Sequence, residues 1–499
     1  MEADGGISTH STVGNQGLLS RGFLALLATH FLVIVNDNTF RWLAVGLGKQ
    51  LVSPENKESV VSAGFACLII PYLLLAAPAG YLADKYSKRS VLVGCKLAEV
   101  FAMLLSAAAA WSQNLPLMMA AILLLGSIAA LYGPAKLAII PEVVAPNRIS
   151  AANGALGLAT VIAVSIGTVL GNSLSDWALM HFSTSLTTAT ALLLTVGSVG
   201  LVISLGIDRV PAGDPTRRFP SNPVSDVWRD FQHLARNRSL LMVTMGSAIF
   251  WTLGGVAHLN VDYYTTQQLD LKQSWVGPLL GILTIGVGVG SVLAGWWSAG
   301  KVELGIVPLG GLGIALSAMM LCWTALFEYV PDVILTSPPF STWLWLLLLG
   351  VSSGLFDVPL ASYIQDRSPA KERGSLMAAF NFMTFSGMLV AAATFWILSD
   401  LLEVSAPIVF LIMGLMTLAV AIYSIVLIPQ ATIRFVIWLA TRLFYRVRIT
   451  GIENIPTSGP ALLVSNHISW LDGIMLITMT SRPIRFLVYA PFAEIWYLR

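Results

Sequence analysis

The chain has 499 residues, of which 56% are hydrophobic and only 11% are charged, whereas a soluble domain carries about 25% charged residues. This composition, with a mean hydropathy of +0.77, excludes an ordinary soluble enzyme and indicates a protein that faces a lipid bilayer. The formal net charge of +2 is too small for a nucleic-acid binder, so we expect no nucleic-acid partner. Three cysteines lie singly in apolar runs, and we expect neither a metal site nor a cofactor: Cys67, Cys95 and Cys322.

The first twenty residues are polar and lack the order of a cleaved signal peptide, so we expect the chain to start in the cytoplasm. About twelve continuous apolar stretches follow, each long enough to cross the hydrocarbon core as a helix. Their approximate limits are 22–47, 60–83, 90–112, 116–140, 151–175, 187–207, 240–262, 275–299, 304–326, 341–364, 374–399 and 405–428. The fold class predicted is therefore an all-α polytopic membrane protein.

Basic residues gather in the loops on one side of these spans, which the positive-inside rule places in the cytoplasm. The short loops on that side contain Lys85, Lys88, Arg89, Arg148, Lys301, Arg367, Lys371 and Arg373. The opposite side offers only Lys49, Lys57 and Lys272. An even number of spans then puts both termini in the cytoplasm.

A repeat divides the spans into two sets of six. Pro134 is followed by Arg148, and Pro359 is followed by Arg373 at the same separation. We therefore predict six-helix halves at 1–207 and 240–429, joined by a polar linker at 208–239. Two similar halves with a linker are typical of alternating-access transporters, which bind their substrate between the halves.

The composition changes after the twelfth span. Residues 430–448 mix arginines with aromatic and aliphatic residues, which favours an amphipathic helix in the membrane interface over a thirteenth crossing. Residues 449–499 begin a polar region in which we expect a turn, a strand over the sequence ALLV and a second turn.

The loop GYLADKYSKR at 80–89 resembles the signature loop of the major facilitator superfamily, although Ser87 replaces a usual Gly and the second-half copy, AGWWSAGKVE, lacks the acid. The resemblance implies a twelve-helix bundle of two six-helix halves. It also implies a gate at the cytoplasmic mouth in which Asp84 pairs with Arg148, with Gly80 and Arg89 as further gating residues. The alternative is a positive-inside turn that contains one chance acid.

Charged residues inside the spans are costly and therefore candidates for function. The first span contains VNDNTFR, in which Asp37, Asn38 and Arg41 lie well inside the membrane. A cation and an anion that face one cavity suit a zwitterion, so we expect Asp37 to meet an amine and Lys136 or Arg41 to meet a phosphate. The other predicted substrate-binding residues are Tyr132, His258 and Asp357.

Three more charges in the spans receive a different interpretation. Lys96 and Asp262 lie close to the ends of their spans, so we expect both side chains to reach the interface. For Glu99, an internal ion pair and a functional role remain equally open.

Residues 451–472 contain Asn466, His467 and Asp472 in the order NHxxxxD, after a Gly-x-Glu-x-x-Pro segment. This region resembles the opening of the glycerolipid acyltransferase domain, an α/β fold. The resemblance implies that His467 acts as general base on a glycerol hydroxyl and that Asp472 orients the imidazole. The family's downstream phosphate-binding blocks have no match here, so we expect a part of a longer fusion whose fragment is inactive as an enzyme.

The whole chain is similar to bacterial lysophospholipid transporters fused to an acyltransferase, with motifs at 80–89, 132–154 and 451–472. The resemblance implies a monomeric inner-membrane protein that flips lysophosphatidylethanolamine or lysophosphatidylglycerol to the inner leaflet. The fused enzyme would re-acylate the lipid from acyl-carrier protein or acyl-CoA, and membrane lipids are further partners. Two alternatives stay open: a proton-coupled exporter of amphipathic drugs, and an enzyme whose helices only anchor it.

Overall fold

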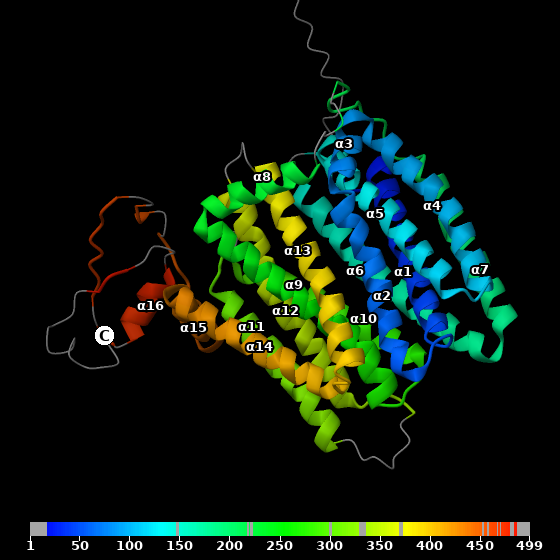
Figure 1. The fold of residues 1–499 in the computed structure, drawn as a ribbon. Coiled ribbons are helices and arrows are strands. Elements are labelled where there is room, and N and C mark those ends of the chain that lie inside the picture. Colours follow the sequence, from blue (N-terminus) through cyan, green and yellow to red (C-terminus); the bar gives the residue numbers. More distant parts are fainter. Residues whose placement is uncertain are drawn as a thin grey trace, which may run out of the picture.

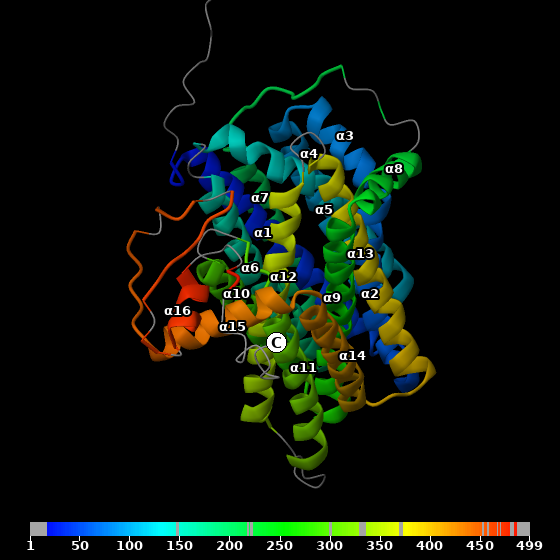
Figure 2. The same ribbon diagram turned by 90° about the vertical axis from the view of Figure 1, so that its left-hand side faces the viewer.

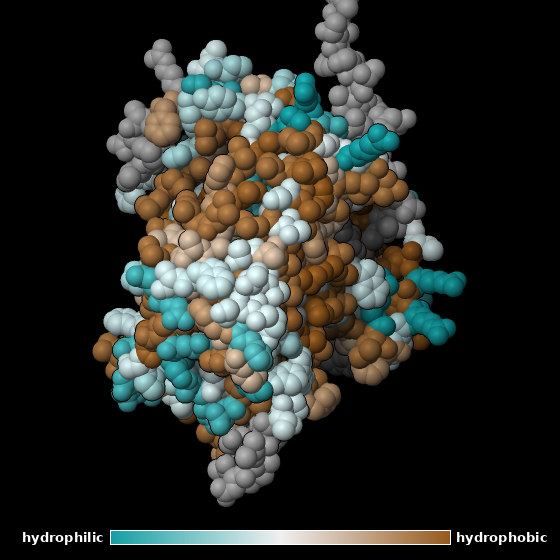
Figure 3. All heavy atoms as spheres, turned by 90° about the vertical axis from the view of Figure 1, so that its right-hand side faces the viewer, coloured by the Kyte–Doolittle hydropathy of each residue, from teal (hydrophilic) through white to brown (hydrophobic). Residues whose placement is uncertain are grey.

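The computed structural model describes residues 17–145, 149–216, 219, 223–298, 302–328, 336–368, 373–451, 454–456, 459–466, 468–469, 471–479 and 484–486. Among these residues, twelve helices are long and apolar enough to cross a membrane, which confirms the predicted number. They lie side by side in one bundle (Figure 1). Apolar side chains predominate over the middle of the face in Figure 3, and hydrophilic ones gather nearer its ends, as a bilayer requires.

The first half of the bundle comprises α1 (Arg21–Gly48), α2 (Lys57–Leu74), α3 (Ala76–Lys85), α4 (Lys88–Trp111), α5 (Leu115–Val143), α6 (Ile149–Met180) and α7 (Phe182–Ser204). The second comprises α9 (Arg238–Tyr263), α10 (Val276–Ser298), α11 (Ile306–Trp323), α12 (Phe340–Arg367), α13 (Arg373–Trp396) and α14 (Ala406–Leu427). Three of these helices, α9, α11 and α13, continue into single π-helical turns, at Tyr264–Gln268, Thr324–Glu328 and Ile397–Leu401.

The two halves repeat the same packing. In the first half α1 packs against α6, α2 against α5 and α4 against α7; in the second, α9 packs against α13, α10 against α12 and α11 against α14. The halves meet along α2 with α13 and along α6 with α10. We call the end of the bundle that carries α3 the linker end, and the end formed by residues 49–56, 264–275 and 397–405 the distal end (Figures 1 and 2).

The second span is not the single helix that the sequence predicts. It breaks at Leu75, where φ is −101° and ψ is 7°, and continues as α3. Pro78 explains the break, because it has no N–H to donate to the carbonyl of Leu74 and its ring clashes with that carbonyl. The signature loop therefore begins on a short, separate helix.

The linker contains a helix that was not predicted, because its four prolines are typical of an irregular connection. This helix, α8 (Pro223–Arg236), lies at the linker end (Figure 2). Pro223 takes the first helical position, where the missing N–H costs nothing. Asn237 then starts α9, because its side-chain oxygen accepts hydrogen bonds from the backbone N–H groups of Ser239 and Leu240 at 3.1 and 3.2 Å.

The C-terminal region departs from the prediction in one respect. Helix α15 (Pro429–Phe444) turns away from α14 (Figure 2), and a short α16 (Leu471–Met479) follows. Between them, within the described residues, no strand is formed, so the strand predicted over ALLV at 461–464 is wrong. Leu462 and Val464 are 80% and 83% exposed, and among the described residues of this region no neighbouring strand pairs with them.

Helices α10 and α12 approach so closely that glycine is required between them. A Cβ atom on Gly290 would collide with the backbone of Val351. Gly290→Leu is therefore expected to cost about 1–3 kcal/mol of stability, seen as a lower Tm of the purified protein. Gly295→Leu is the matched control on the same helix, because a Cβ there meets nothing within 4 Å. An equal loss of Tm in both variants would contradict this view of the α10–α12 contact.

Candidate functional site

A stripe of polar side chains runs along α1. His30, Asp37 and Arg41 are spaced by seven and four residues, so they lie within about 40° of one another around the helix axis. From His30 to Asp37 the rise is about 10 Å. His30 and Arg41 are only 4% and 7% exposed, although both are polar. We call these three residues the α1 stripe.

At one end of the stripe, His30 joins three helices. Its Nε2 lies 2.9 Å from the Thr160 hydroxyl on α6 and 3.4 Å from the Lys136 ammonium on α5. The Tyr132 ring, also on α5, stacks parallel to the imidazole with centroids 6.2 Å apart. The structure thus brings the predicted residues Tyr132 and Lys136 together through His30.

The hydroxyl of Thr160 determines how this cluster is protonated. Thr160 donates its one proton to the carbonyl of Leu156 at 2.8 Å, so its oxygen accepts from His30. His30 Nε2 is then an N–H donor and cannot accept a proton from Lys136. The Lys136 ammonium is left with donors directed at no acceptor among the described residues, which suits an anionic ligand.

At the other end of the stripe, Arg41 reaches the second half of the bundle. Its guanidinium lies 4.9 Å from the centroid of the Trp42 ring, and one of its nitrogens is 3.4 Å from His258 Nε2 on α9. The His258 ring sits between Trp42 and Phe65, with centroids 6.1 and 6.2 Å away. The structure therefore joins the predicted residues Arg41 and His258.

Asp37 lies between these two clusters and is half-buried. Its carboxylate has no hydrogen bond or ion pair with any residue that the structure describes. The neighbouring Asn38 differs, because its amide donates to the carbonyl of Ile34 on the same helix at 2.9 Å. The carboxylate of Asp37 is thus available to a ligand, whereas one N–H of the Asn38 amide is engaged within its own helix. The role of Asn38 in binding stays a prediction.

The predicted position of Lys96 is wrong. Lys96 is fully buried and forms an ion pair with Glu99, both Nζ–Oε distances being 2.8 Å. Asn36 of α1 donates to Glu99 Oε1 at 3.1 Å and to the carbonyl of Leu193 at 3.2 Å. The side chain of Lys96 cannot reach the interface because α1 and α7 cover it, so the pair is an internal one.

Asp262 is also misplaced by the sequence interpretation. It is fully buried at the distal end, where it forms an ion pair with Lys49. Asp357, another predicted binding residue, accepts a hydrogen bond from Ser247 of α9 at 3.1 Å. Among the described contacts, Asp357 therefore belongs to the second half and does not meet the α1 stripe.

The predicted gate lies beside the linker. The backbone N–H of Asp214 donates to the carbonyl of Asp84 at 2.9 Å. The Ser87 hydroxyl donates to the backbone carbonyl of Val210 at 2.7 Å. Arg89 donates to the carbonyls of Ile207 and Leu205, both at 2.8 Å, at the end of α7. The linker is thus bound to the signature loop.

The positions of Gly80 and Arg148 do not decide whether Asp84 pairs with Arg148. A Cβ on Gly80 would meet nothing within 4 Å, so no close approach requires this glycine. Arg148 lies outside the described residues. The pairing of Asp84 with Arg148 therefore stays a prediction.

The predicted acyltransferase motif is described only in part, because His467 lies outside the described residues. The Asp472 carboxylate accepts hydrogen bonds from the backbone N–H groups of Ile468 and Ser469, at 2.6 and 2.8 Å. Asp472 thus fixes the backbone turn that follows His467, at the start of α16.

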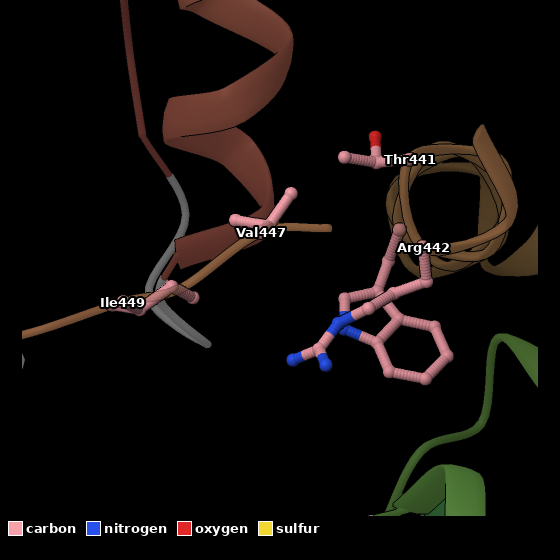
Figure 4. A pocket seen from close by; sticks show the side chains of 5 residues that line it. Thr441, Arg442, Val447 and Ile449 are labelled. Carbon is pink, nitrogen blue, oxygen red and sulfur yellow. The ribbon is translucent and has the colours of Figure 1, made fainter. Parts of the chain in front are cut away.

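A shallow pocket separates α15 from the chain that leads to this motif (Figure 4). Figure 4 shows Arg442 reaching across it, and the guanidinium lies 5.5 Å from the centroid of the Trp438 ring. The lining residues are Trp438, Thr441, Arg442, Val447 and Ile449.

Sequence reasoning missed His30 and Thr160. His30 carries a usable signal, since it precedes Asp37 by seven residues and hence lies on the same face of a helix. Thr160 carries none, because a single threonine in an apolar span ordinarily bonds its own helix.

Comparison with known proteins finds two family matches and several named relatives. Residues 23–392 match the family model of the Major Facilitator Superfamily, and residues 446–499 match that of the Acyltransferase family. The chain is 25% identical over 387 residues to the Lysophospholipid transporter LplT of Serratia proteamaculans, covering 75% of this chain and 87% of the relative. It is 28% identical over 359 residues to the LplT of Klebsiella pneumoniae strain 342, covering 71% and 82%.

Solved structures share the fold at low identity. A crystal structure of a POT family transporter in complex with 5-aminolevulinic acid superimposes with a TM-score of 0.66 at 12% identity, covering 84% of this chain and 99% of the other. The repeated six-helix packing, the match over 23–392 and this likeness lead to one conclusion. The chain belongs to the Major Facilitator Superfamily, and its residues 446–499 match the Acyltransferase family.

Proposed function

We propose that the protein transports lysophospholipids across the bilayer and delivers them for re-acylation. The α1 stripe is the observation that carries this proposal. At one end of the stripe, the cation of Lys136 lies beside His30. The free carboxylate of Asp37 follows, and the guanidinium of Arg41 lies at the other end. This order of charges complements a phosphate joined to an amine.

The same stripe can accommodate two headgroups. Lysophosphatidylethanolamine would place its phosphate at Lys136 and its amine at Asp37, with charge-assisted hydrogen bonds to both. Lysophosphatidylglycerol has no amine, so its headgroup would depend on the cations and on hydroxyl contacts. The relatives named as lysophospholipid transporters support this substrate class.

The orientation that we propose places the linker end in the cytoplasm of a bacterial inner-membrane protein. The support is the basic residues of the loops at that end, under the positive-inside rule. Lipid would then move from the outer to the inner leaflet and arrive beside the acyltransferase. Delivery there raises the effective concentration of acyl acceptor without any new contact.

Binding of lysophosphatidylethanolamine to the purified full chain tests the substrate class. We expect saturable quenching of tryptophan fluorescence by the lysolipid, because Trp42 stacks on Arg41 of the stripe. A single-chain amphipathic cation without a phosphate is the matched ligand, and it is expected to bind at least about tenfold more weakly. Stronger binding of the cation would overturn the proposal and favour the drug exporter, in which Asp37 carries a proton.

We also propose that α15 lies in the membrane interface. One face is fixed to the protein, because Arg434 donates to Glu303 at 2.7 Å and Phe435 is only 2% exposed. Leu443 and Phe444, at the end of the helix, are 75% and 76% exposed beside arginines. Exposed apolar and basic side chains together suit an anionic lipid surface.

Quenching of a fluorophore on Ile437→Cys, at the middle of α15, tests this placement in vesicles that contain phosphatidylglycerol. We expect nitroxides at shallow lipid positions to quench it more than nitroxides deep in the bilayer. Stronger quenching by the deep nitroxides would show that α15 is a thirteenth crossing.

A further inference from the structure

The halves of the bundle are tied together at the distal end by polar contacts that the proposed transport does not use. Lys49, just after α1, forms an ion pair with Asp262 of α9. Gln273, before α10, donates to Asp262 and, at 2.9 Å, to Asn172 of α6. The backbone N–H of Ser274 donates to Asp176 at 2.7 Å.

A second set of contacts lies beside the first. The N–H and the hydroxyl of Ser59, in the first turn of α2, donate to one Asp400 oxygen at 3.0 and 2.7 Å. The indole N–H of Trp396 donates to the Ser59 hydroxyl at 3.1 Å. Both sets connect the first half to the second, so the distal end is closed in this structure.

The charges in the first set are buried. Lys49 is 6% exposed, Asp262 is fully buried and Glu58 is 5% exposed. A buried charge that loses its partner is strongly destabilising. Burial disfavours the charged form of Lys49, but the Asp262 and Glu58 carboxylates outweigh it and raise the pKa of Lys49 above its usual value. Lys49 therefore stays a cation that needs an acidic partner.

Glu58 differs from the other charged residues of this set in that its carboxylate forms no close contact. Its carboxylate lies 3.9 Å from Lys49, and neither oxygen has a hydrogen-bond partner among the described residues. Glu58 and Lys49 belong to the same half, whereas Asp262 belongs to the other. When the halves separate, Lys49 must leave Asp262, whereas Glu58 moves together with Lys49.

We propose that Lys49 controls a gate at the distal end by exchanging ion-pair partners. It pairs with Asp262 when the gate is closed and with Glu58 when the gate is open. Glu58 thus stabilises the open state by keeping Lys49 paired after Asp262 has gone. This role requires only that the halves part, and it does not depend on which substrate the protein carries.

Removal of each acid is expected to shift the gate in opposite directions. Asp262→Asn weakens the closed state, so the population of the open gate rises by at least about tenfold, which corresponds to 1.4 kcal/mol. Glu58→Gln weakens the open state, so that population falls by a similar factor. If the role of Glu58 were purely structural, both variants would be less stable. The population of the open gate would then stay unchanged in both, or would shift in the same direction in both.

Distances between spin labels on Asn56→Cys and Gln267→Cys measure the gate directly in proteoliposomes of the full chain, in a background without the three native cysteines. Both positions are exposed at the distal end on different halves. Opposite shifts of the long-distance population in the two variants support the proposal. Equal shifts, or no shift in Glu58→Gln, overturn it.

Two further variants keep the test decisive. Glu55→Gln removes an exposed carboxylate three residues from Glu58 and is expected to leave the distances unchanged. Gln273→Ala removes one bond to Asp262 but keeps all three charges, so it replaces Asp262→Asn if that variant does not fold. It is expected to raise the open population more modestly, and a fall would contradict the proposal.

Discussion

Replacement of Asp37 by Asn is expected to reduce transport of lysophosphatidylethanolamine by about 10- to 100-fold. The loss of a charge-assisted hydrogen bond to the amine costs about 1.5–3 kcal/mol, and each 1.4 kcal/mol is a factor of ten. Transport of lysophosphatidylglycerol should fall much less, because that headgroup has no amine. Initial rates in proteoliposomes for the two lipids measure this difference.

The matched variant is Lys136→Gln, which removes the cation proposed to meet the phosphate. Because both lipids carry the phosphate, we expect both rates to fall together. Asp270→Asn serves as the control, since Asp270 is an exposed carboxylate at the distal end. Full transport of both lipids by the double variant Asp37→Asn/Lys136→Gln would show that the α1 stripe does not bind the headgroup.

Replacement of Lys96 by Met is expected to destabilise the protein by about 3–5 kcal/mol, because it leaves the buried carboxylate of Glu99 without its cation. The double variant Lys96→Met/Glu99→Gln should regain most of that loss, since Gln can still accept the hydrogen bond from Asn36. Thermal unfolding in detergent measures both variants. If the single and double variants are equally unstable, the ion pair is not the cause.

The number of spans could be predicted from the sequence, because only helices satisfy the backbone hydrogen bonds of continuous apolar runs of bilayer length. The limits were less certain, since the span predicted over 60–83 breaks at Leu75. The positions of charges within the spans were harder to predict. Lys96 and Asp262 lie near the ends of apolar runs, which suggested the interface. Lys96 is buried against Glu99, which lies three residues further along the same helix, so the sequence shows this pair but not its burial by neighbouring helices. Asp262 is buried against Lys49, 213 positions away, and no local pattern predicts that pair.

The candidate site shows the same division. Asp37 and Arg41 could be placed on one face from their spacing along α1, and the helix confirms that they share it. The contact of Arg41 with His258 joins two residues 217 positions apart, and no local pattern predicts it. The ALLV segment failed for the opposite reason: its local pattern favours a strand, but a strand forms only where a partner is present.

Movement of a fluorescent lysophosphatidylethanolamine between leaflets tests the central claim most directly. The lipid is added to proteoliposomes of the full chain, and dithionite then reduces the fluorophores that remain in the outer leaflet. We predict protected fluorescence that requires the protein and saturates with lysolipid, and that is lost in Asp37→Asn/Lys136→Gln. Protection equal to that of protein-free vesicles would contradict the assignment of this chain as a lysophospholipid transporter.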